Sequence, residues 1–185
     1  MSRFVRVSSR LVACAIVALA CNGCALLATD PPATVSSVDI DRYVGQWYEI
    51  ASYPVFFNKD LTGVTATYAR LDDGRVSVFN RGFKGALDGP ESTIRGKARV
   101  TDTTTNSKLA VRFDQFPTNL FEGQYWIVVL DPDYQYAAVS DPQRATLFVL
   151  SRTPQMDDET YQDILSQLAA NGFDTAKLKR TLQPE

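Results

Sequence analysis

Few side chains in this sequence are of the kinds that carry out covalent chemistry. The chain has 185 residues and no histidine, and its three cysteines are Cys14, Cys21 and Cys24. Without histidine, the usual general base, the Ser-His-Asp and Cys-His nucleophile systems and most zinc sites are excluded. An enzyme would have to use Glu49, a tyrosine or an aspartate as acid and base. We therefore expect a binding protein rather than an enzyme, with neither a metal nor a cofactor.

Residues 1–20 have the features of an export signal. A positive segment comes first, with Arg3, Arg6 and Arg10. Leu11–Ala20 follows as an apolar stretch, shorter than the ~20 residues needed to span a bilayer. Small residues precede Cys21, as in a bacterial lipobox, where the cysteine becomes the lipidated N-terminus. The pattern predicts lipidation at Cys21, with Cys24 as the alternative; a simple secretory signal cut near Ala20 would leave both unmodified.

The rest of the chain divides into a tether and one domain. Residues 21–37 contain Pro31-Pro32 and no apolar periodicity, which is typical of a linker. Residues 38–185 form a single predicted domain without cysteine, so no disulfide supports it. Once the three arginines of the export signal are removed, 16 basic residues remain against 21 acidic ones. This balance argues against a nucleic-acid partner.

Eight short runs of alternating apolar residues follow one another, separated by turn signals. They cover residues 46–53, 62–71, 75–83, 91–101, 108–114, 123–130, 135–140 and 145–152. Such consecutive hairpins are typical of an all-β protein, and a meander removes its edges best by closing. We predict an eight-stranded antiparallel up-and-down β-barrel, with a two-sheet sandwich as the alternative.

The last part of the domain changes its period. Apolar residues at Tyr161, Ile164, Leu165 and Leu168 have helical spacing. The pattern predicts an α-helix over residues 157–171 that packs on the outside of the barrel. Leu178–Gln183 is predicted to add a short final strand.

Three stretches together resemble the motifs of the lipocalin family, in particular its bacterial outer-membrane lipoprotein branch, which is related to apolipoprotein D. They are Gly45–Glu49, Leu130–Tyr134 with Tyr136–Val139, and Leu150–Pro154. The resemblance covers roughly residues 38–183. It implies that Trp47 closes the narrow end of the barrel below the guanidinium of Arg152, with Gly45 allowing the close approach. It also implies that the loop after the first strand covers the open mouth.

Candidate ligand contacts come from this expected barrel and its mouth. They are Glu49, Phe56, Phe57, Tyr68, Asn80, Phe113, Tyr125 and Tyr136. Glu49 shares the parity of Trp47 and should point inward, where it either faces a ligand headgroup or pairs with a base such as Arg81. Asn80 is either a polar anchor in the cup or an outward-facing strand residue. A single β-bulge reverses the parity of a strand, so the sequence leaves these assignments open.

The resemblance implies a lipid-anchored carrier of fatty acids or lysophospholipids that stores or transports them in the cell envelope, for example for membrane maintenance under stress. Asn22 follows the predicted acylated cysteine, where an Asp is the familiar inner-membrane retention signal, so we expect the outer membrane, facing the periplasm. We expect a monomer or a weak homodimer. The alternatives are a structural lipoprotein with a filled barrel and a carrier of a quinone or pigment.

Overall fold

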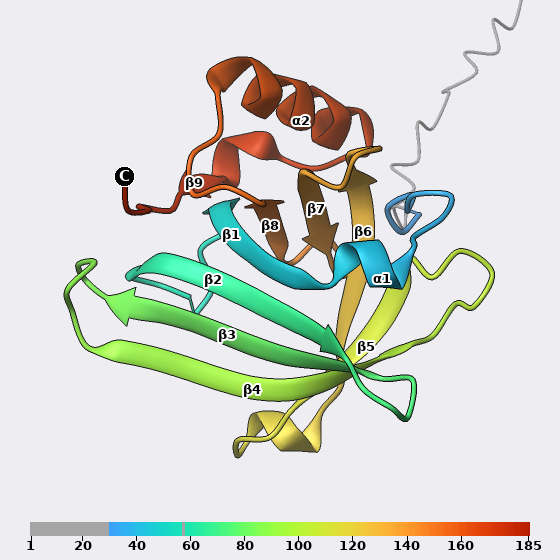
Figure 1. Cartoon of the computed structure of the whole chain (residues 1–185). Helices are drawn as coiled ribbons and strands as arrows, with labels where there is room; N and C mark the ends of the chain where they lie inside the picture. The colour runs from blue at the N-terminus through green and yellow to red at the C-terminus, as the bar shows by residue number, and fades with distance from the viewer. Residues whose placement is uncertain (1–29, 57) are drawn as a thin grey trace, which may run out of the picture. The chain divides into compact units, whose positions relative to one another are not determined.

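Eight antiparallel strands close into a barrel in the computed structural model (Figure 1). They are β1 (Gly45–Ser52), β2 (Leu61–Arg70), β3 (Val76–Lys84), β4 (Glu91–Val100), β5 (Lys108–Phe113), β6 (Gly123–Leu130), β7 (Tyr136–Ser140) and β8 (Leu147–Ser151). Each strand pairs with the next, and β1 pairs with both β2 and β8, which closes the ring. The predicted barrel is confirmed, and each strand lies within two residues of its predicted bounds.

The structure describes residues 30–56 and 58–185, and the folded unit begins at Pro31. The predicted export signal, both candidate lipidation sites at Cys21 and Cys24, and most of the tether lie outside the described residues. Phe57 lies outside them as well. Over the part that is described, no helix combines the length and apolarity needed to cross a membrane.

Apolar residues form two layers, one on each side of the barrel wall. The inner cluster includes Trp47, Tyr68, Val78 and Ile127, all buried. The outer cluster lies between the strands and helix α2 (Asp158–Ala170), with Ile164 and Leu168 fully buried. Asp157 caps the helix by accepting a hydrogen bond from the Thr160 amide at 2.8 Å. The predicted C-terminal helix on the outer wall is therefore confirmed (Figure 1).

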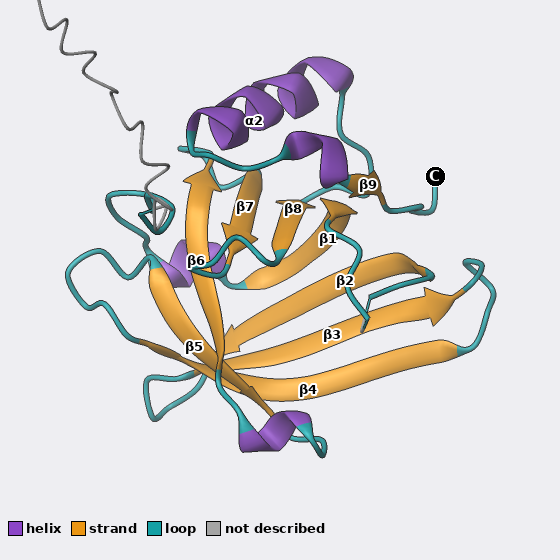
Figure 2. Cartoon of the chain, turned by 180° about the vertical axis from the view of Figure 1, so that it is seen from behind, coloured by secondary structure: helices purple, strands orange, loops and turns teal. Residues whose placement is uncertain are grey.

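The C-terminal segment lies beside β1. After η2 (Thr175–Lys177), the two-residue strand β9 (Lys179–Arg180) pairs with Ala51 and Ser52 of β1, as Figure 2 shows. The next residues connect to β2, because the Gly63 amide donates to the Leu182 carbonyl at 2.7 Å. The tail thus joins β1 and β2 at the end of the barrel where these two strands stop pairing with each other.

Three short helices were not predicted, one of which is η2 of the C-terminal segment. Helix α1 (Ile40–Tyr43) precedes β1, and its N-cap Asp39 accepts hydrogen bonds from the amides of Asp41 and Arg42. The 3-10 helix η1 (Thr118–Leu120) lies in the loop between β5 and β6. The chain direction of β1, from α1 to Ser52, defines the two ends of the barrel. The closed end carries α1, and the mouth carries the loops at residues 53–60, 85–90, 114–122 and 141–146.

Candidate functional site

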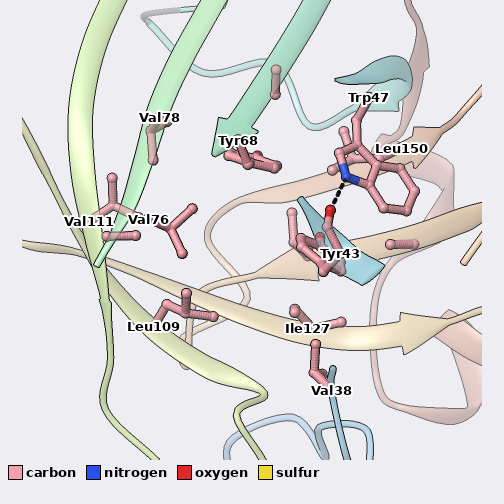
Figure 3. Close-up of a cluster of buried hydrophobic side chains, with 14 residues drawn as sticks. Val38, Tyr43, Trp47, Tyr68, Val76, Val78, Leu109, Val111, Ile127 and Leu150 are labelled. Atoms are coloured by element: carbon pink, nitrogen blue, oxygen red, sulfur yellow. Dashed lines mark hydrogen bonds between the residues drawn. The ribbon is translucent and has the colours of Figure 1, made fainter. Parts of the chain in front are cut away.

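The closed end is held by an arginine over an indole. Trp47 is fully buried, and its Nε1 donates to the Tyr43 carbonyl at 2.8 Å, the dashed line in Figure 3. The Arg152 guanidinium lies 3.7 Å from the centre of the indole ring. It also donates to four backbone carbonyls, those of Arg42, Tyr43, Gln46 and Tyr134. A cation–π contact shielded from water is worth roughly 2 kcal/mol, so this group stabilises the fold rather than presenting a binding surface.

Gly45 makes room for this arginine. Its φ is +103°, a backbone conformation that favours glycine. A Cβ atom at this position would lie 3.1 Å from Arg152 Nη1. The backbone can therefore pass close to the guanidinium only because residue 45 has no side chain.

Three tyrosine hydroxyls meet above the indole and form the floor of the barrel. The Tyr43 hydroxyl lies 2.7 Å from that of Tyr125, which lies 3.2 Å from that of Tyr68. Burial raises the pKa of all three, that of Tyr68 to about 12, so they stay neutral at physiological pH. Three hydroxyls share two hydrogen bonds, which leaves one hydroxyl hydrogen for another acceptor. We call Tyr43, Trp47, Tyr68 and Tyr125 the floor.

Glu49 is the next inward residue of β1 on the mouth side of Trp47. It lies opposite Leu150 of the inner cluster and is only 6% exposed. Its Oε1 accepts hydrogen bonds from Ser52 Oγ at 2.8 Å and Thr181 Oγ1 at 2.6 Å. Burial raises the pKa of Glu49, and these two bonds partly oppose that shift.

Arg81 does not pair with Glu49, which corrects one of the two sequence-based interpretations. Its Nε donates to Glu91 at 2.9 Å, and both side chains are about half exposed. On β3, buried Val78 and Gly82 alternate with exposed Arg81, so the guanidinium lies on the outer face. Glu49 therefore has no cationic partner among the described residues.

Asn80 lies on the inner face of β3. It is opposite Ala66 of β2 and Ile94 of β4, and it is the next inward residue after Val78. Its Oδ1 is buried and has no hydrogen-bond partner. The structure thus selects the inward position from the two that the sequence left open.

Gln183 adds a second buried acceptor from the C-terminal tail. Its Nε2 donates to the carbonyls of Glu49 and Val64 at 2.8 and 2.9 Å, which bridges β1 and β2. Its Oε1 is buried without a partner. No local pattern predicts this contact, because Gln183 reaches residues that lie 119 and 134 positions away in the chain.

The mouth is apolar. Phe113 packs against the inner cluster at the mouth end of β5. Phe56 in the loop after β1 is 91% exposed, and Phe116 and Phe121 in the β5–β6 loop are 79% and 68% exposed. Three large apolar side chains on two loops of this end form what we call the rim: Phe56, Phe116 and Phe121.

Tyr136 lies outside the barrel, contrary to its place among the candidate ligand contacts. It packs against the outer cluster and shares a side-chain hydrogen bond with Gln167 of α2. The neighbouring Ala137 belongs to the inner cluster, so Tyr136 has the outward parity. Tyr136 therefore does not belong to the inward-facing residues from which ligand contacts can come.

Comparison with known proteins agrees with this architecture. The model of the lipocalin-like domain family matches residues 38–183. The chain belongs to the lipocalin family. It is 37% identical to the outer membrane lipoprotein Blc of Escherichia coli strain K12 over 177 residues, covering 94% of this chain and 96% of that protein. It is 36% identical to temperature-induced lipocalin-1 of Arabidopsis thaliana, covering 82% of each.

Solved structures show the same fold. Insecticyanin from the tobacco hornworm Manduca sexta superposes with a TM-score of 0.64 at 19% identity, covering 85% of this lipocalin and 86% of that chain. At this identity the similarity concerns the barrel alone. The residues inside the cup must therefore be interpreted from this chain's own contacts.

Proposed function

We propose that this lipocalin is an outer membrane lipoprotein that binds a small hydrophobic ligand and stores or transports it in the cell envelope. The observation that carries the proposal is a barrel with a packed floor at one end and an apolar mouth at the other. The relationship to Blc supports the location, since Blc is named as an outer membrane lipoprotein. In this proposal the tether is acylated at Cys21, and the domain faces the periplasm.

The ligand class that suits this cup is a single-chain lipid, such as a fatty acid or a lysophospholipid. Burial of an acyl chain contributes about 0.8 kcal/mol per methylene. A chain of ~14 methylenes would contribute roughly 11 kcal/mol before the loss of translational and rotational freedom is subtracted. The remainder supports micromolar binding or better without any covalent chemistry. We propose that the protein acts by burial rather than by catalysis, in membrane maintenance under stress.

The test is mass spectrometry of lipid that co-purifies with the full-length protein from its native membrane. The delipidated protein is then titrated with a fluorescent fatty acid and a fluorescent lysophospholipid. Trp47 lies inside the barrel and Trp126 packs against the outer cluster, so a Trp126→Phe variant isolates the inner signal. We expect saturable quenching of Trp47. A flat titration with both probes, and no bound lipid, would favour the filled-barrel alternative.

The anchor is tested separately. We expect a Cys21→Ser protein to leave the membrane fraction and a Cys24→Ser protein to stay in it. The opposite result would move the acylation site to Cys24, and retention of both variants would contradict a lipid anchor on either cysteine.

A further inference from the structure

Polar atoms inside this barrel are concentrated next to the floor. On the inner face of β1, Glu49 is the next residue after Trp47 toward the mouth. On the inner face of β3, Asn80 is the next residue after Val78, which pairs with Tyr68 of β2. The charge of Glu49 also contributes to the raised pKa of Tyr68, which places the carboxyl near the tyrosine hydroxyls. The barrel interior next to the floor therefore combines a carboxyl, a carboxamide and hydroxyls, whereas the rim is apolar.

Two of these polar atoms, Glu49 Oε2 and Asn80 Oδ1, are hydrogen-bond acceptors without a donor. Both bonds to Glu49 end on Oε1, and no described residue donates to Oε2. Asn80 Oδ1 is buried and unpaired. An unpaired buried acceptor costs about 1–3 kcal/mol, so a native structure normally supplies it with a partner. A ligand that carries donors would supply the missing partners.

Cations are absent from this part of the cup in the described strands. Between the floor and the mouth the inward positions of β3 and β4 hold no charged residue; they are Asn80, Gly82, Ser92, Ile94 and Gly96. Arg81 and Arg95 of the same strands take the outward positions, and Arg95 lies 4.1 Å above the Phe79 ring. The nearest lysine on β3 is Lys84, which is exposed at the end of that strand. A carboxylate at the floor would thus meet Glu49, and the one guanidinium of the closed end, Arg152, is stacked on Trp47 with its hydrogen bonds directed to four backbone carbonyls.

We infer that the ligand binds head-first, with a donor-bearing hydroxyl or ammonium head on Glu49 and Asn80 and its chain toward the apolar mouth. This inference rests on the proposed function and narrows its ligand class. A hydroxyl head donates to Glu49 Oε2 and Asn80 Oδ1, and it accepts the spare hydrogen of the tyrosine hydroxyls. An ammonium head also neutralises the Glu49 carboxylate. A free fatty acid is disfavoured in this orientation, because its carboxylate faces a second carboxyl.

The test compares four ligands with one C18:1 chain and different heads: 1-monooleoylglycerol, oleylamine, oleate and methyl oleate. Each displaces a fluorescent fatty acid from the delipidated full-length protein at pH 7.5. We expect the first two to bind about ten-fold or more tightly than the last two, because a hydrogen bond to a charged group contributes at least that factor. The contrary orientation, with the head at the mouth beside Lys84, predicts that oleate binds most tightly.

Glu49→Gln is the decisive variant. It keeps an acceptor for Ser52 and Thr181, but it replaces the free Oε2 acceptor with an amide donor. We expect the preference for 1-monooleoylglycerol over oleate to fall about ten-fold or to reverse. Asn80→Asp should strengthen oleylamine binding selectively. Phe113→Ala is the matched control and should weaken all four ligands to a similar extent, since it contacts the chain and not the head.

The outcomes separate the inference from the function on which it rests. Equal binding of all four heads, or tightest binding of oleate with loss of that binding in Lys84→Gln, overturns the head-first orientation and leaves the carrier function intact. Failure of all four ligands to displace the probe overturns the orientation as well, and together with a flat direct titration it overturns the carrier. Thermal unfolding of each variant shows whether an altered preference comes from a folded protein.

Discussion

The two ends of this barrel are built on opposite principles. At the closed end, one guanidinium lies over Trp47 and donates to four backbone carbonyls, so the charged group and the carbonyls around it satisfy one another. On the mouth side of this floor, Asn80 Oδ1 is buried without a partner, and at the mouth itself the rim exposes phenylalanine rings to solvent. A satisfied end stabilises the fold, and an unsatisfied end is free to gain from a ligand. Stability and function are therefore separated along the same strands.

The largest expected effect is at the closed end. Trp47→Ala removes a fully buried indole together with its contact to Arg152, and we expect a loss of about 3–5 kcal/mol in the free energy of unfolding. Urea denaturation measures this loss. The matched substitution at the mouth is Phe121→Ala, which should change the same free energy by less than about 0.5 kcal/mol because the ring is exposed. Similar losses at both ends would remove the separation.

A second prediction concerns how the arginine acts. Arg152→Lys keeps a positive charge, but an ammonium cannot donate to four carbonyls and stack on the ring at once. We expect a loss of about 2–3 kcal/mol, again from urea denaturation. A lysine variant as stable as the wild type would mean that charge alone holds the closed end. Gly45→Ala should also lower the free energy of unfolding, because the alanine would have to adopt a positive φ and its Cβ would lie close to Arg152 Nη1.

The third prediction tests the unsatisfied carboxyl through pH. Burial raises the pKa of Glu49 above its unfolded value, so the folded protein keeps the Glu49 proton to a higher pH than the unfolded chain does. Below the unfolded pKa, Glu49 is protonated in both states and does not lower the free energy of unfolding. As the pH rises through the folded pKa, the carboxylate becomes buried and the free energy of unfolding falls. Glu49→Gln should flatten this fall in the free energy of unfolding between pH 4 and pH 8. A profile that is unchanged in the variant would show that other groups cause the dependence.

The smallest effect on stability is expected at the rim, where the effect on lipid exchange should be clear. Phe116→Ser with Phe121→Ser should leave unfolding within about 0.5 kcal/mol of the wild type. The same pair should slow transfer of a fluorescent lipid from vesicles several-fold, because exposed apolar side chains favour contact with a lipid surface. Asn119→Ala in the same loop is the control. If the double variant takes up the fluorescent lipid from vesicles as fast as the wild type, the rim has no part in lipid exchange.

The sequence alone determined the architecture of this protein. Alternation with period two fixed eight strands, turn residues separated them, and helical spacing with Asp157 and Asn171 at its ends fixed α2. These signals come from residues close together in the chain, so they can be interpreted without knowledge of the fold. The pairing of Trp47 with Arg152 was foreseen only through the family resemblance, because 105 residues separate the two positions in the chain.

Only the tertiary structure decided what each inward residue meets. A bulge between Glu49 and Ala51 turns Ser52 inward, where simple alternation from Glu49 would turn it outward. The same strand then meets Thr181 of the C-terminal tail, 132 residues away. Strand register and barrel closure also decide that Tyr136 points outward and that the buried acceptors of Asn80 and Gln183 have no partner. Periodicity records which residues share a face, but barrel closure brings distant strands together and so decides which polar groups find partners.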